Sequence, residues 1–400
     1  MMIRISDSVY SVGVLNPNLR VFDIVMKTEY GTSYNSFLIK GEKNVLIETC
    51  HEKYFDEYME HIGEVISPAE IDYIILNHTE PDHSGSLARL LDAAPRAEIV
   101  CSQAASIYLR GITNRADLKL RVAKDGDTLD IGGGKKLAFI NAPFLHWPDS
   151  MFTWFEAEKT LFSCDFFGSH YCEPRMIDTA ITHPKAYWTA FRGYYDAIFG
   201  PFKPYVLGGL DKIKDLDVET VCTSHGPVLT AKGLLPEVKE LYREWSQPHV
   251  NAVKTIPIFY CTAYGNTGLA AGAIREGILE VIPDAKIDLY DLIEHAMADC
   301  AGALAGSDAF LIGSPTINRD AVPPVWELLA HVDLVNNQKK PVAVFGSFGW
   351  SGEAVPAVMN RLNTMKLAVF GDGFKFNFVP SGEELEKARQ FGRDFAASLK

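Results

Sequence analysis

Short apolar segments alternate with turn residues from residue 1 to about residue 245. Residues 71–78 (IDYIILNH) and 160–165 (TLFSCD) are typical: each is an apolar run that ends in a polar side chain, a pattern that predicts a buried strand. Two longer stretches, 52–66 and 185–198, have apolar residues at helical spacing. Strands therefore outnumber helices in this part. The other strand-like runs are 32–41, 43–50, 97–102, 136–143, 150–155 and 219–226.

The pattern changes near residue 250, where strands and helices begin to alternate. Such alternation predicts a doubly wound parallel sheet with helices on both faces. We therefore expect two domains, 1–250 and 251–400. In the second domain the expected strands are 256–261, 286–292, 308–316 and 341–350, and the expected helices include 269–282 and 383–399.

Side chains that bind metal ions follow several of the predicted strands of the first domain. The run from His78 to His83 (HTEPDH) contains two imidazoles and, at Glu80 and Asp82, two carboxylates. Loops at strand ends form sites on a rigid scaffold, and mixed imidazole and carboxylate ligation suits iron, manganese or zinc. Two sets of such ligands could each hold a cation, and a shared carboxylate could bridge the two. Three further candidate ligands end later apolar runs: His146, Asp165 and His225.

A lone histidine in a half-apolar segment is more often a core or surface residue than a ligand. Seven ligand-type residues at strand ends outweigh that alternative. The seven cysteines are scattered and form no C-x-x-C pair, which excludes an iron–sulfur centre or a fused rubredoxin module. They indicate free thiols in a reducing cytoplasm.

Charge and hydropathy narrow the partners and the location. Lys and Arg number 38 against 51 Asp and Glu, a net charge of −13, which argues against nucleic acid or an anionic membrane as partner. No apolar run approaches the length of a membrane span. The first residues carry one Arg and no long apolar run, so we expect no signal peptide.

The second domain contains three loops suited to a phosphorylated cofactor. Residues 262–267 (TAYGNT) follow a strand and precede a helix, so hydroxyls and free backbone N–H groups can bind a phosphate at the helix N-terminus. Two later loops follow strands at the crevice where such a sheet binds its ligand. Trp350 is a candidate to stack on a cofactor ring, the alternative being core packing. The candidate cofactor-binding residues are Thr262, Ala263, Tyr264, Gly265, Asn266, Thr267, Ser314, Pro315, Thr316, Ile317, Asn318, Ser347, Phe348, Gly349, Trp350, Ser351 and Gly352.

Both halves resemble known families. The loop at 262–267 resembles the phosphate loop of flavodoxins, which bind FMN. The H-x-E-x-D-H motif resembles the H-x-H-x-D-H motif of the metallo-β-lactamase family, whose fold is an αββα sandwich and whose members are usually zinc hydrolases. In this chain Glu80 stands in place of the second histidine of that motif. That exchange, together with the LHWPDSM run around His146, is similar to the flavodiiron proteins (A-type flavoproteins). This resemblance covers nearly the whole chain and matches the order of the two domains.

The flavodiiron resemblance implies FMN and two iron ions per chain. One iron is then held by His78, Glu80 and His146, and the other by Asp82, His83 and His225, with Asp165 as the bridge. Some members of the family leave the position of His83 uncoordinated. Near the irons we expect Tyr195 and His170 to supply hydrogen bonds or protons, Tyr194 being an equally good tyrosine by sequence.

The resemblance also implies a function and an assembly. Electrons would pass from an external donor, through FMN, to the irons, and reduce dioxygen to water, nitric oxide to nitrous oxide, or both. Rubredoxin is the usual donor, and a reduced deazaflavin coenzyme serves some archaeal members. A head-to-tail homodimer, or a dimer of dimers, would bring the flavin of one subunit to the irons of the other.

Two other classes of protein remain open at this point. One is a zinc hydrolase with an accessory flavodoxin domain, and the other is a flavodoxin-like electron carrier with a vestigial metal domain. Glu80 and the flavin loops count against hydrolysis, which uses no electrons, and the complete set of ligands counts against the carrier.

Overall fold

The computed structural model describes residues 2–24 and 26–399, which form two compact units. The first unit ends at Gln247 and the second begins at Pro248. Within the described residues, no helix combines the length and the apolar character that crossing a membrane would require.

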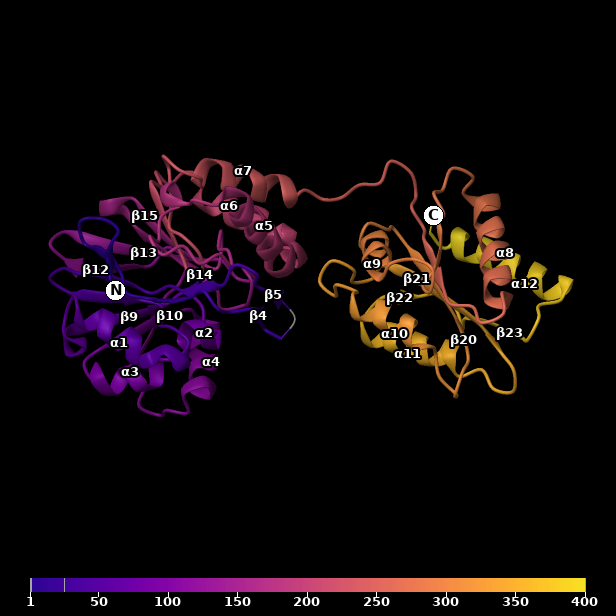
Figure 1. The fold of residues 1–400 in the computed structure, drawn as a ribbon, viewed down its shortest axis with the longest axis horizontal. Helices are drawn as coiled ribbons and strands as arrows, with labels where there is room; N and C mark the ends of the chain where they lie inside the picture. The colour runs from indigo at the N-terminus through magenta and orange to yellow at the C-terminus, as the bar shows by residue number, and fades with distance from the viewer. Residues whose placement is uncertain (1, 25, 400) are drawn as a thin grey trace. The chain divides into compact units, whose positions relative to one another are not determined.

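The first unit is built on two β-sheets that pack face to face (Figure 1). The first sheet has the strand order β1 (Ile3–Arg4), β2 (Val9–Ser11), β7 (Phe37–Ile39), β8 (Asn44–Ile47), β9 (Ile71–Leu76), β10 (Glu98–Cys101) and β11 (Leu120–Val122). The second has the order β12 (Thr128–Gly132), β13 (Lys135–Asn141), β14 (Met151–Phe155), β15 (Thr160–Cys164), β16 (Thr220–Thr223) and β17 (Leu229–Thr230).

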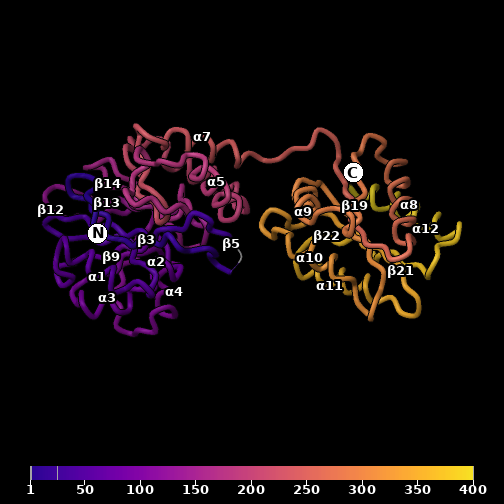
Figure 2. The backbone as a smooth tube through the Cα atoms, viewed as in Figure 1, coloured from indigo at the N-terminus to yellow at the C-terminus, as the bar shows by residue number. Residues whose placement is uncertain are grey.

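Alternating apolar residues of the two sheets fill the space between them. Phe37 and Ile75 of the first sheet belong to the same buried cluster as Phe139 and Phe162 of the second. The outer face of the first sheet carries α1 (Phe55–Gly63), α3 (Leu87–Ala93) and α4 (Gln103–Thr113), which lie together in Figure 2. The outer face of the second sheet carries α5 (Pro184–Tyr194), α6 (Lys203–Ile213) and α7 (Leu235–Trp245). The expected αββα sandwich is confirmed.

The second unit is a parallel sheet in the order β19 (Leu289–Asp291), β18 (Ile258–Tyr260), β20 (Phe310–Pro315), β21 (Pro341–Phe348) and β22 (Ala368–Val369). A further strand, β23 (Phe374–Asn377), also pairs with β21 in parallel. The first strand in the chain lies between the second and the third, which is the order of flavodoxins and places a topological switch point between β18 and β20. This confirms the expected doubly wound sheet.

Helices cover both faces of this parallel sheet. One face carries α8 (Asn266–Val281) and α12 (Gly382–Ala397), and the other carries α9 (Met297–Ala305), α10 (Pro323–Ala330) and α11 (Ala354–Thr364). Two glycines let α8 and α12 approach closely. A Cβ atom on Gly277 would lie 1.9 Å from the carbonyl oxygen of Arg389, and one on Gly392 would lie 2.2 Å from that of Ile274. A larger residue at either position would push the two helices apart.

Candidate metal centre and flavin pocket

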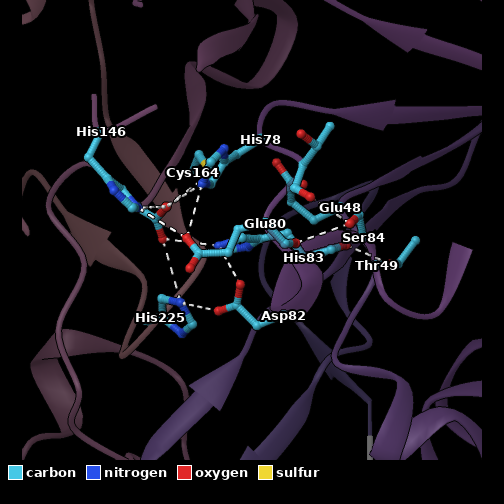
Figure 3. Close-up of polar contacts among 12 residues, drawn as sticks. Glu48, Thr49, His78, Glu80, Asp82, His83, Ser84, His146, Cys164 and His225 are labelled. Carbon is cyan, nitrogen blue, oxygen red and sulfur yellow. Dashed lines mark hydrogen bonds and ion pairs between the residues drawn. The ribbon is translucent and has the colours of Figure 1, made fainter. Parts of the chain in front are cut away.

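The seven predicted metal ligands all lie at one edge of the sandwich, although they come from both sheets. His78 follows β9 of the first sheet. Glu80 precedes the short helix α2 (Pro81–Ser84), which carries Asp82 and His83. The second sheet supplies the others: His146 from the loop between β13 and β14, Asp165 directly after β15, and His225 just after β16. Figure 3 shows six of these side chains converging.

The seven side chains divide into two sets that share Asp165. In the first set, Oε2 of Glu80 lies 3.2 Å from Nε2 of His78 and 3.3 Å from Nε2 of His146. Oδ2 of Asp165 lies 3.5 Å from Nε2 of His146. The same four side chains can offer one atom each to a single ion.

The other oxygen of Asp165 faces the second set. Its Oδ1 lies 3.3 Å from Nε2 of His83 and 3.5 Å from Nε2 of His225. Asp82 completes this set, with 3.0 Å between its Oδ2 and His225 Nε2. One carboxylate therefore presents one oxygen to each group of three ligands, as a bridging ligand must.

The geometry fits cations better than it fits a hydrogen-bonded cluster. Both oxygens of Asp82 and Nε2 of His83 are buried and make no hydrogen bond within the described residues, although neighbouring ligand atoms lie 3.0–3.4 Å away. Buried polar atoms rarely go unpaired. Metal–ligand bonds of about 2.1 Å place adjacent ligand atoms about 3.0 to 3.5 Å apart, which is the spacing seen here. The residues present therefore fit a pair of metal ions.

Residues behind the ligands hold the imidazole rings in position. Nδ1 of His78 lies 3.2 Å from both oxygens of Asp149, which also accepts hydrogen bonds from the backbone N–H and the hydroxyl of Thr79. Nδ1 of His225 donates to the carbonyl of Ser33 at 2.6 Å. Such contacts orient the Nε2 atoms toward the metal. Sequence reasoning missed Asp149; its place three residues after His146 was the available signal.

Electrostatics keep the carboxylates of the centre ionised. Burial by itself would lower the pKa of His78, but its hydrogen bonds to Asp149 and Glu80 outweigh this and raise that pKa to about 10. Burial also opposes ionisation of Asp165, yet the neighbouring histidines, His83 first, hold the pKa of its carboxyl well below the usual range. Anionic carboxylates are the form that binds iron. Just outside, Glu48 is fully buried, and burial raises its pKa to about 8.

The tyrosine at the centre is Tyr194, and the prediction for Tyr195 is corrected. The hydroxyl of Tyr194 donates to Oδ1 of Asp165 at 3.0 Å, whereas the hydroxyl of Tyr195 pairs with that of Ser246 at 2.8 Å. Consecutive residues of a helix point in directions about 100° apart, so only one of the two can face the metal ligands. Sequence alone does not fix that rotation.

His170 lies beside the second set of ligands, where it was expected. Its ring is 5.1 Å from that of His225, and its Nδ1 is 2.9 Å from the hydroxyl of Thr32. Burial, with repulsion from His225, lowers the pKa of His170 to about 3. The ring is therefore neutral at physiological pH, with one nitrogen as donor and the other as acceptor.

The three predicted flavin loops of the second unit line one cavity of about 290 Å³ at the switch point of the sheet. Gly265, at φ +82°, is the N-cap of α8 and provides no side chain to cap the helix, so the N–H groups of the first turn are available to a ligand. Thr262 lines the cavity, and its buried hydroxyl has no partner among the described residues. This hydroxyl and the helix N-terminus fit a phosphate.

Exposed aromatic rings stand at the rim of this cavity. Trp350 is 83% exposed and Tyr264 is 91% exposed, so core packing does not explain Trp350. Phe378 also lines the cavity. Sequence reasoning missed it because it lies directly after β23, outside the three loops from which the cofactor site was predicted. Of the seventeen candidates, thirteen line the cavity, and Gly265, Ser314, Ser351 and Gly352 do not.

Known protein families match both halves of the chain. The model of the ODP family beta lactamases matches residues 32–226, and the flavodoxin model matches residues 258–392. The flavo-diiron protein FprA2 of Clostridium acetobutylicum is 56% identical over 99% of this chain and 99% of its own length. The anaerobic nitric oxide reductase flavorubredoxin of Salmonella arizonae is 35% identical over 99% of this chain and 82% of its own. The solved structure of rubredoxin oxygen:oxidoreductase from Desulfovibrio gigas aligns with 100% of this chain and 98% of that one, at 27% identity and a TM-score of 0.72.

A metallo-β-lactamase-like domain with ligands for two cations, followed by a flavodoxin domain, defines a class of flavin- and metal-dependent oxidoreductases. The chain belongs to the flavodiiron proteins, also called type A flavoproteins. This membership confirms the enzyme class and the cofactors expected from the sequence, FMN and a di-iron centre.

Proposed function

We propose that this enzyme reduces dioxygen to water, nitric oxide to nitrous oxide, or both, at the seven-ligand centre. The observation that carries the proposal is Asp165, whose two oxygens each face a separate set of ligands. Bound iron supplies electron transfer to a small diatomic molecule, and FMN relays electrons from the donor. Relatives named for oxygen reduction and for nitric oxide reduction support both substrates.

We assign the protein residues the following roles. His78, Glu80 and His146 would hold one iron, Asp82, His83 and His225 would hold the other, and Asp165 would contribute to both sites. Asp149 fixes the orientation of His78 through its Nδ1. The hydroxyl of Tyr194 holds a proton at the bridging carboxylate. In the second domain, the loop at 262–267 holds the phosphate of FMN and Trp350 covers its ring.

Rapid mixing tests the proposed reaction directly. The protein is reduced completely without oxygen, then mixed with dioxygen or with nitric oxide in separate experiments while the FMN absorption band is followed. We expect rapid reoxidation by at least one gas. If the FMN stays reduced with both gases, each for many turnover times of a typical enzyme, the result contradicts the proposal.

Metal and flavin analysis separates the two other classes. Two irons and one FMN per chain are expected from the two ligand sets and the single flavin cavity. Zinc without a reducible flavin would favour the hydrolase, although Glu80 occupies a position where the zinc hydrolases usually have histidine. Flavin without metal would favour the electron carrier.

We further propose a head-to-tail homodimer or a dimer of dimers, with electrons from rubredoxin or a reduced deazaflavin coenzyme. The flavin cavity opens to the surface, with Tyr264 and Trp350 exposed at its rim, so another protein surface can approach it. A variant made monomeric by interface substitutions is expected to keep FMN and iron and to lose turnover. Full activity from a monomer verified by light scattering would contradict the dimer proposal.

A further inference from the structure

A second cavity, of about 380 Å³, lies in the first unit beside the metal centre. Its outer lining includes the exposed residues Lys27, Glu29 and Thr189, and its inner lining includes the buried Thr28, His170 and Tyr194. The lining runs between the segment after β5 (Met26–Lys27) and one face of α5. The cavity thus extends from charged surface residues to residues behind the metal ligands.

Two polar atoms at the inner end lack partners. The hydroxyl of Thr28 and Nε2 of His170 are both buried, with residue exposures of 1% and 4%, and form no hydrogen bond within the described chain. Both residues line the cavity. A buried donor or acceptor without a protein partner normally bonds to ordered water. Liquid water occupies about 30 Å³ per molecule, so the cavity has room for roughly ten.

Two of the inner residues, Tyr194 and His170, lie one hydrogen bond or a short series of contacts from a candidate metal ligand. Tyr194 donates to Oδ1 of Asp165 at 3.0 Å. His170 pairs through Nδ1 with the hydroxyl of Thr32 at 2.9 Å, and that hydroxyl lies 3.4 Å from Nδ1 of His225. The cavity therefore reaches the shared carboxylate and the second set of ligands through two separate contacts.

We propose that this cavity is a hydrated channel through which protons enter and product water leaves the metal centre, past Thr28, His170 and Tyr194. Reduction of dioxygen and of nitric oxide both consume protons and release water, while the electrons come from FMN, so either reaction needs such a path. Water bonded to Thr28 and His170 continues the hydrogen-bonded series from bulk solvent to the hydroxyl of Tyr194. The role of the channel rests on the proposed function, whereas its presence rests on the cavity and the two unpartnered atoms.

The first test concerns the water alone and needs no activity. A crystal structure of the iron- and FMN-loaded protein at about 1.5 Å is expected to show ordered water at Thr28 Oγ1 and His170 Nε2. The Thr28→Val variant keeps the shape of the side chain and removes its hydroxyl, so the water at that position is expected to disappear. A dry cavity in the parent protein overturns the proposal even if no gas is reduced.

The second test narrows the channel. Gly193 lines the cavity and is exposed, and apart from its chain neighbours and the backbone of its own helix no atom lies within 4 Å of the position that a Cβ atom would take there. The Gly193→Leu variant therefore adds bulk without a backbone clash. We expect it to slow reoxidation several-fold and to increase the solvent deuterium isotope effect, with iron and FMN content unchanged. Gly208→Leu on α6 is the matched control, because Gly208 is equally open and lies outside the cavity lining.

The outcomes distinguish a proton path from other routes. An unchanged rate and isotope effect in Gly193→Leu, with the leucine seen inside the cavity, overturns the proposal. A weaker apparent affinity for the gas with an unchanged isotope effect would identify entry of the diatomic substrate instead and also overturns it. A parent protein inert to both gases defeats the proposed function, while the crystallographic test of the water still stands.

Discussion

The Asp165→Asn variant is expected to lose most of its iron and at least about 99% of its turnover. The substitution removes the negative charge that both sets of ligands share and leaves one side of the bridge with an amide nitrogen, which does not bind iron. Buried histidines on both sides then face one another without the anion between them. Iron content by elemental analysis, FMN content by absorbance and steady-state gas consumption measure the outcome.

Asp178→Asn is the matched control for that experiment. Asp178 is a buried carboxylate of the same unit, but its oxygens accept hydrogen bonds from Thr230 and Leu234, and it is not one of the predicted metal ligands. Weakening these bonds is expected to cost about 1 to 3 kcal/mol of stability and to leave the iron in place. If Asp165→Asn retained both irons, Asp165 would not be the bridge.

The Ala263→Glu variant is expected to bind FMN at least about tenfold more weakly than Ala263→Gln. Ala263 lines the flavin cavity within the proposed phosphate loop. The two replacements have nearly the same size, so the difference between them isolates the repulsion between a carboxylate and the phosphate dianion, for which about 1.4 kcal/mol corresponds to a tenfold change. Fluorescence titration of flavin-free protein with FMN gives both dissociation constants.

Salt provides a second check on the charge effect. The gap between the Glu and Gln variants is expected to narrow as ionic strength rises, because salt screens charges near the surface. Iron content should be the same in both variants, since the metal ligands belong to the other unit. Equal affinities of the two variants for FMN would place the phosphate away from Ala263.

The strands and the residues of the candidate metal centre could be predicted from the sequence because their signals are local. Residues 71–78 were expected to be a strand that ends at a ligand, and β9 covers Ile71–Leu76, with Asn77 between its end and His78. Asp165 and His225 follow the same rule just after β15 and β16, whereas His146 lies in the loop between β13 and β14. The loop before α8 was equally local, since its glycine and hydroxyl residues lie between a strand and a helix.

Contacts between distant segments could not be predicted in this way. The choice between Tyr194 and Tyr195 depends on how α5 rotates against Asp165. Asp149 reaches His78 across 71 residues of sequence, and Phe378 enters the flavin cavity only because β23 pairs with β21. Tertiary packing fixes such distances, and a single sequence shows only the residue types that it brings together.

The metal ligands come from both halves of a sandwich, which has a mechanical consequence. His78, Glu80, Asp82 and His83 follow a strand of the first sheet, whereas His146, Asp165 and His225 belong to the second. A cation bound by both groups adds its binding free energy to the work of pulling the sheets apart. An iron pair bound by these residues would therefore hold the two sheets together at that edge, and we expect loss of iron to lower the free energy of unfolding of the first unit.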